Sequence, residues 1–212
     1  MFPIHSVGFD PDFVPYAVGL DLQSKHIEQV STDAGEGALL LLEHASVYTA
    51  GRRTRESDRP AGGTPVVDVD RGGRITWHGP GQLVGYPIVR LAKPRDLVGY
   101  VRALESMIIN ALGDVGVTGV RIEGRTGVWT GSPERPEKVA QIGVRVARGV
   151  TSHGFAINCT NDLAPFRAIV PCGISDAGVT TISRVTGTSI TPTDLLPSLR
   201  ARAKELYEEV AA

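Results

Sequence analysis

The chain has 212 residues, of which 42% are hydrophobic and 21% charged, and its formal net charge is -1 at pH 7. This composition excludes a disordered chain, and the small net charge argues against broad binding to nucleic acid or to a membrane surface. The N-terminus lacks the pattern of a secretory signal, and the longest aliphatic block, residues 38–42, is too short to span a bilayer. With two cysteines, the sequence predicts a cytoplasmic protein with free thiols, built as one domain over residues 1–212.

The first half of the chain is expected to form one helix followed by strands, because the spacing of apolar residues changes after about residue 30. In chain order we expect a helix over residues 16–30, a β-rich run over 38–49, a polar loop over 54–65, and strands over 65–70, 74–77 and 83–91.

The second half contains two further helices and a hairpin. The elements and boundaries expected there are a helix over 96–112 capped by Asp96 and ended by Gly113, a hairpin over 138–159 turning at Arg148-Gly149, and a helix over 193–210 capped by Thr193 or Asp194. The expected fold is α/β (α+β), with a mixed, largely antiparallel β-sheet flanked by helices.

Cys172 is the candidate nucleophile. It lies in the step Pro171-Cys172-Gly173, where proline fixes φ before the thiol and glycine removes bulk after it, so the sulfur can be presented on a bend. A structural role is the alternative, because free cysteines are among the most often buried residues. Cys159 shares a strand side with Phe155, which favours packing over chemistry.

Lys138 enters the first strand of the expected hairpin. Counted by alternation, it shares a side with Val144 and Val146, so its amine would start from an apolar face. Burial favours the neutral form of a lysine, which is a usable base. The alternative is a lysine at the strand entrance whose amine reaches water.

Residues 71–82 form the most glycine-dense stretch of the chain, with the sequence RGGRITWHGPGQ. Glycines let a backbone approach a ligand closely, and the interleaved Arg, Trp and His supply charge, a stacking surface and a titratable ring. The stretch matches neither phosphate-binding glycine pattern, so it does not predict a nucleotide site. Two tight turns around a short strand are the alternative interpretation.

His44, His78 and His153 lie near the ends of strand-like runs, where each could be a ligand, a base or a structural imidazole. A metal site formed by them with Cys172 is an alternative, but no C-x-x-C or H-E-x-x-H motif accompanies them and we expect no metal. A basic loop follows residue 49; it is solvated by default and could receive an acidic carrier protein. Its arginines are Arg52, Arg53, Arg55 and Arg59.

Five blocks occur in one order along the chain, at residues 42–52, 71–83, 138–143, 153–158 and 171–174. Together they resemble the lipoyl(octanoyl) transferases, and they cover most of the chain between residues 39 and 183. The resemblance implies the fold of the biotin and lipoate protein ligase catalytic domain. It also implies transfer of an octanoyl group from acyl carrier protein to a lysine of a lipoyl domain, the first step in making protein-bound lipoate.

The same resemblance assigns roles to individual residues. It implies that Cys172 carries the acyl group as a thioester and that Lys138 lowers the pKa of that thiol, with His153 and His44 as auxiliary candidates. The substrate-binding residues that it implies are Arg71, Gly72, Gly73, Arg74, Ile75, Thr76, Trp77, His78, Gln141, Ile142, Gly143, Gly154, Phe155 and Ala156.

The partners expected from this resemblance are proteins. It implies no cofactor, because the acyl group arrives on the phosphopantetheine of octanoyl-acyl carrier protein. The acceptors would be lipoyl domains of 2-oxoacid dehydrogenase complexes and the H protein of glycine cleavage, with no nucleic acid and no membrane. The alternatives are an ATP-dependent lipoate ligase on the same fold, a cysteine hydrolase using Cys172 with His153, and a non-catalytic acyl or metal carrier.

Overall fold

A computed structural model describes residues 2–32, 37–169 and 177–212. In chain order its elements are β1 (Ile4–Gly8), α1 (Tyr16–Ser31), β2 (Ala38–Leu42), β3 (Val47–Ala50), the 3-10 helix η1 (Glu56–Asp58), β4 (Val66–Asp68), β5 (Thr76–His78), β6 (Gln82–Ile88), α2 (Leu97–Asp114), β7 (Val120–Ile122), β8 (Arg125–Ser132), β9 (Arg135–Ala147), β10 (Val150–Asn158), α3 (Ala164–Arg167), β11 (Gly178–Val179), α4 (Ile182–Thr186) and α5 (Pro192–Val210).

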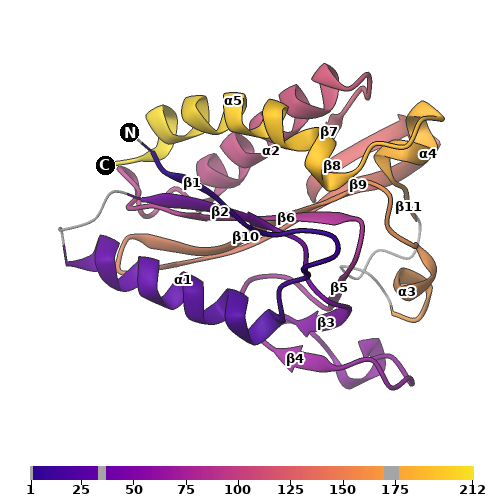
Figure 1. Ribbon diagram of the computed structural model, residues 1–212, viewed down its shortest axis with the longest axis horizontal. Helices are drawn as coiled ribbons and strands as arrows, with labels where there is room; N and C mark the ends of the chain where they lie inside the picture. The colour runs from indigo at the N-terminus through magenta and orange to yellow at the C-terminus, as the bar shows by residue number, and fades with distance from the viewer. Residues whose placement is uncertain (1, 33–36, 170–176) are drawn as a thin grey trace.

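The larger of two sheets forms the centre of the molecule. Its strand order is β1-β2-β6-β10-β9-β8-β7, with β11 paired beside β9. Only the β1–β2 and β9–β11 pairs of this sheet are parallel among the described residues. Helices α2 and α5 cover one face and α1 lies on the other (Figure 1). The predicted mixed, largely antiparallel sheet flanked by helices is therefore confirmed.

Strand β2 shows how one strand serves both helix layers. Leu39 and Leu41 belong to the apolar cluster under α2 and α5, whereas Leu40 and Leu42 belong to the cluster under α1. All four side chains are at most 1% exposed. Because successive side chains of a strand point to opposite faces, a strand buried on both sides is aliphatic throughout.

The β-rich run expected over residues 38–49 is two strands in two different sheets. The chain leaves the large sheet after β2, and β3 joins a small sheet of order β4-β3-β5. Glu43 marks the departure: its amide donates to the Gly8 carbonyl and its Oε2 accepts from the Gly81 amide at 2.7 Å. Both strands are buried, so hydrophobicity alone could not separate them.

One predicted boundary of each helix in the second half is wrong, whereas the Asp96 cap and the end at Val210 are confirmed. Helix α2 is capped by Asp96 as predicted, but it continues through Gly113 to Asp114, and the chain reverses at Gly116, which has φ 81°. Helix α5 begins earlier than expected: Thr191 caps it and exchanges hydrogen bonds with Asp194. Proline at the first helical position suits that geometry, because its missing N–H needs no partner there.

The predicted hairpin is confirmed, with β9 and β10 joined by Arg148 at φ 52° and Gly149 at φ 80°. The side of β9 predicted for the Lys138 side chain is not confirmed. Val128 pairs with Ala140 and Trp129 pairs with Lys138, so β9 advances two residues where β8 advances one. Such a β-bulge interrupts the alternation that placed Lys138 on the same side as Val144.

No helix within the described part of the chain has the length and apolar character that a membrane crossing requires.

Candidate active site

A pocket of about 670 Å³ lies where β9 and β10 of the large sheet meet β5 and the glycine-rich loop. Most of the residues implied by the resemblance line it. They are Lys138, Arg71, Gly72, Gly73, Arg74, Thr76, His78, Gln141, Ile142, Gly143, His153, Gly154, Phe155 and Ala156. The structure therefore brings together three blocks that lie far apart in the sequence.

Three of the expected residues lie outside this lining. Ile75 and Trp77 alternate with Thr76 and His78 along the chain, so they point away from the pocket and pack in a separate apolar cluster. The Trp77 indole donates to the Ser46 hydroxyl at 2.9 Å. His44 is also outside the lining, fully buried behind it.

Arg71 holds the glycine-rich loop in shape. One nitrogen of its guanidinium donates to the carbonyls of Gly72 and Arg74, at 2.9 and 2.8 Å. The other donates to the Thr49 carbonyl at 2.6 Å and to the Thr49 hydroxyl at 2.8 Å. Gly73, at φ 83°, adopts the left-handed conformation that this loop needs. These contacts give Arg71 a structural part in building the pocket wall.

The three candidate histidines are uncharged near neutral pH. Burial lowers the pKa of His44 to about 4 and that of His153 to about 4. Burial, followed by the electrostatic repulsion that a proton on His78 would meet from a protonated His44, lowers the pKa of His78 to about 3. His78 contacts the Gln82 amide oxygen at 2.8 Å, and His153 Nε2 lies 2.9 Å from an oxygen of Asp70. Neutral imidazoles of this kind shape a pocket without adding charge to it.

We expect His44 to make the protein less stable as the pH falls. Its Nδ1–H donates to the Val14 carbonyl at 2.8 Å, which leaves Nε2 to accept from the Tyr86 hydroxyl at 2.7 Å. In the unfolded chain the ring takes up a proton below about pH 6.5, but in the folded protein only near pH 4. The free energy of unfolding therefore falls by up to about 3 kcal/mol as the pH drops from 6.5 to 4.

The measurement is urea unfolding of the wild type and His44→Asn at pH 7 and at pH 4. Asparagine keeps a donor for Val14 and removes the titrating ring, so the stability advantage of the wild type over the variant should shrink at pH 4. If that advantage is equal at both pH values, His44 binds protons equally in the two states and the expectation is wrong.

The described pocket lining is strongly cationic. Six of its residues carry a positive charge, and none carries a carboxylate. Two of the six, Arg53 and Arg55, come from the basic loop predicted after residue 49. The others are Arg71, Arg74, Arg125 and Lys138. Since the whole chain has a formal net charge of -1, positive charge is concentrated at this opening, which suits an anionic ligand.

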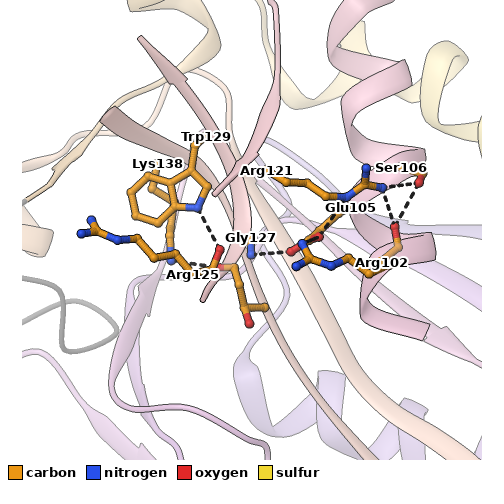
Figure 2. Close-up of polar contacts among 9 residues, drawn as sticks. Arg102, Glu105, Ser106, Arg121, Arg125, Gly127, Trp129 and Lys138 are labelled. Atoms are coloured by element: carbon orange, nitrogen blue, oxygen red, sulfur yellow. Dashed lines mark hydrogen bonds and ion pairs between the residues drawn. The ribbon is translucent and has the colours of Figure 1, made fainter. Parts of the chain in front are cut away.

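Lys138 is buried at one wall of the pocket, with 5% of its surface exposed. Its Nζ donates to the Thr126 carbonyl at 2.9 Å and lies over the Trp129 ring, 4.5 Å from the centroid (Figure 2). A carbonyl oxygen and an aromatic face are both good partners for an ammonium. The amine is thus held in one place instead of extending into water.

Cys172 lies outside the described residues, within 170–176. The chain that follows this range is placed beside Lys138: Val179 in β11 pairs with Lys138, and the Thr180 amide donates to the Lys138 carbonyl at 3.0 Å. The other cysteine, Cys159, is fully buried in the core, and burial raises the pKa of its thiol. Its predicted packing role is confirmed.

Sequence reasoning missed several contributors to this pocket. Tyr16 from α1 and Tyr86 from β6 line it beside His78, and Thr126 supplies the acceptor for Lys138. Each is a single residue in a segment without a recognisable motif, so no local signal marked it. Within the described ranges, no group of three or more His, Cys, Asp or Glu side chains is arranged to hold a metal ion.

Comparison with known proteins identifies the family of this chain. The lipoyl protein ligase A/B catalytic domain family matches residues 15–203. The chain belongs to that family. An octanoyltransferase from Leifsonia xyli is 55% identical over 207 residues, covering 97% of this chain and 92% of its own length. One from Salinispora tropica is 54% identical, covering 91% and 92%.

Solved structures of lipoate protein ligases share the fold of this chain at low sequence identity. A lipoate protein ligase A bound with ATP superposes with a TM-score of 0.70 and 14% identity, covering 98% of this chain and 85% of its own. A putative lipoate protein ligase from T. acidophilum gives the same four values. The similarity to octanoyltransferases at about 55% identity makes this member of the lipoyl protein ligase A/B family an acyltransferase.

Proposed function

We propose that this protein transfers an octanoyl group from octanoyl-acyl carrier protein to a lysine of a lipoyl domain, through a thioester on Cys172. The observation that carries the proposal is the buried amine of Lys138, fixed at the wall of a cationic pocket next to the chain that follows residue 176. The proposed acceptors are lipoyl domains of 2-oxoacid dehydrogenase complexes and the glycine cleavage H protein, in the cytoplasm. No cofactor is proposed beyond the phosphopantetheine of the donor.

The charge of the pocket supports an acyl carrier as the donor. A phosphopantetheine arm carries a phosphate, and Arg53 and Arg55 belong to a pocket lining that includes no carboxylate among the described residues. A cationic opening also attracts an acidic carrier protein, chiefly by speeding its encounter. Salt should therefore weaken donor binding more than it slows the chemical step.

Apolar side chains at the same pocket support a fatty acyl group. Leu97 and Val101 from the first turns of α2 lie in the lining with Ile142, Val144 and Phe155. Burying the six methylenes of an octanoyl chain against such surface yields about 5 kcal/mol of gross binding free energy, at about 0.8 kcal/mol each.

Two half-reactions account for the transfer, starting from a Cys172 thiolate and a Lys138 ammonium. The thiolate attacks the carbonyl carbon of the donor thioester, a new C–S bond forms, and the phosphopantetheine thiolate leaves with the proton of Lys138. The acceptor lysine then enters as an ammonium and gives one proton to Lys138. Its amine attacks the acyl thioester, the Cys172 thiolate leaves, and the second nitrogen-bound proton passes to water.

The deciding experiment is to incubate the protein with octanoyl-acyl carrier protein without an acceptor, to measure its intact mass, and to map the modified peptide. The expected result is one octanoyl group on Cys172 that disappears when a lipoyl domain is added. An adduct on another residue, or transfer without any adduct, would contradict the thioester route. Release of free octanoate with no need for an acceptor would indicate a hydrolase, and bound octanoyl group without turnover would indicate a carrier.

A further inference from the structure

The first three residues of β8, Arg125 to Gly127, are each held by a buried side chain. The Trp129 indole donates to the Arg125 carbonyl at 3.1 Å, and Lys138 donates to the Thr126 carbonyl at 2.9 Å. The Gly127 amide donates to Glu105 Oε1 at 3.0 Å. Figure 2 shows Lys138 and Glu105 on opposite sides of this short segment. One side of the segment is part of the pocket lining, and the other side rests on α2.

Glu105 is an unusual residue for the buried face of a helix. Its side chain is fully buried, yet it carries a carboxylate. Its Oε2 accepts from Arg102 at 2.7 Å and from Arg121 at 3.1 Å, and Arg121 also donates to the Arg102 carbonyl at 2.9 Å and to the Ser106 hydroxyl. A buried carboxylate is costly unless it is paired in this way. The two arginines fix its orientation, so Oε1 is a rigid acceptor for Gly127.

The backbone conformation at Gly127 and the space around it do not accommodate a side chain. Its φ is 110°, and a Cβ at this position would lie 2.5 Å from the Ala140 carbonyl. Pairing of β8 with β9 begins only at Val128, and the β-bulge in β9 between Ala140 and Lys138 follows at once. The amide of Gly127 is therefore turned toward α2, and Glu105 gives it a partner.

We infer that Glu105 is a positioning residue for Lys138. By holding the Gly127 amide, it fixes the preceding Thr126 carbonyl, and that carbonyl fixes the Lys138 amine at the pocket wall. Glu105 does not line the pocket, so it acts on the reaction only through the 125–127 segment. The inference rests on the proposed role of Lys138 in proton transfer. Without Glu105, the Gly127 amide loses its acceptor, the segment relaxes, and the amine loses its fixed point.

The test is the variant Glu105→Leu, with octanoyl transfer measured as kcat and KM for octanoyl-acyl carrier protein. A catalytic group displaced by about 1 Å can cost about 100-fold in rate, so we expect kcat to fall by about 10- to 100-fold while KM changes less than about twofold. The control is Arg202→Ala in α5, which breaks an ion pair to Asp114 at the C-terminal end of α2 and should leave kcat unchanged. If the fall in kcat of Glu105→Leu only matches the fall in its folded fraction, measured by thermal unfolding, the inference is wrong.

A double-mutant cycle with Lys138→Met separates positioning from general damage. If Glu105 acts through Lys138, adding Glu105→Leu to Lys138→Met should lower kcat by less than about twofold further, because the group that it positions is already gone. Independent, multiplicative losses would overturn the inference while leaving the role of Lys138 intact. If Lys138→Met alone keeps full kcat, the proposed role of Lys138 is wrong and the inference fails with it. Should Glu105→Leu not fold, Glu105→Gln, which keeps the volume and removes the charge, takes its place in the same cycle.

Discussion

Replacement of Cys172 by alanine is expected to lower octanoyl transfer by about 10³-fold or more and to abolish the acyl adduct. The thiolate is the group to which the acyl chain becomes bonded, and its removal leaves no nucleophile for the first half-reaction. Loss of a nucleophile in other covalent enzymes has effects of this order or larger. Transfer to a lipoyl domain, followed by the mass shift of that domain, gives the rate for each variant.

The second cysteine provides the matched control. Cys159 is fully buried and far less reactive, since burial raises the pKa of its thiol. Cys159→Ala removes one buried sulfur and should cost about 1 kcal/mol of stability while leaving kcat within a few-fold of the wild type. Should Cys159→Ala abolish the adduct while Cys172→Ala retains it, the assignment of the nucleophile is reversed.

The Cys172→Ala variant also separates transferase from ligase chemistry. A ligase activates a free acid as an adenylate and needs no cysteine, so Cys172→Ala would then modify a lipoyl domain from octanoate and ATP at the wild-type rate. The lipoate ligase structures that superpose on this chain do so at 14% identity or less, so they establish a shared fold and leave the chemistry to such a test.

Local patterns predicted the three long helices and the β9–β10 hairpin, because burial of one face imposes a regular spacing of apolar residues on them; they did not mark β1, β7 or β8. Apolar residues at helical spacing located α1, α2 and α5, and the Arg148-Gly149 turn located the hairpin because both residues adopt positive φ there. The errors lie where contacts with other parts of the chain set an element's boundary or its sheet. Gly113 lies inside α2 because the reversal occurs at Gly116. The run over residues 38–49 divides between two sheets, a choice that its buried aliphatic sequence does not encode.

The segments that line the candidate site could be predicted from the sequence, but the contacts between their side chains could not. Alternation could have shown that Thr76 faces the pocket while Ile75 faces the core. The partners of Lys138 could not be found in this way. Thr126 is 12 residues away, and Glu105 acts from another helix through the Gly127 amide. A bulge between β8 and β9 also changed the side of Lys138, and a bulge is set by pairing across strands.

Two substitutions of Lys138 should stop the reaction at different points. Lys138→Met removes both charge and proton acceptor, and we expect kcat to fall by about 10²- to 10⁴-fold, the usual contribution of a positioned acid or base. Lys138→Arg keeps a positive charge but offers a group that does not give up or accept a proton near neutral pH. With arginine, the acyl-enzyme should form and accumulate, because a cation still favours the Cys172 thiolate and the departing phosphopantetheine thiolate can take its proton from water. Transfer to the acceptor lysine should be blocked.

Rapid-quench mass spectrometry of Cys172 acylation, with and without a lipoyl domain, measures the two steps separately. The pH dependence adds a second criterion, because an isolated thiol ionises near pH 8.5. The thiolate fraction in Lys138→Met therefore rises with pH, so its acylation defect should shrink as the pH passes from 7 to 9, while the defect of Lys138→Arg in the second step persists. If arginine supports both steps at the wild-type rate, Lys138 acts through its charge alone, and the acceptor lysine must lose its proton to another group.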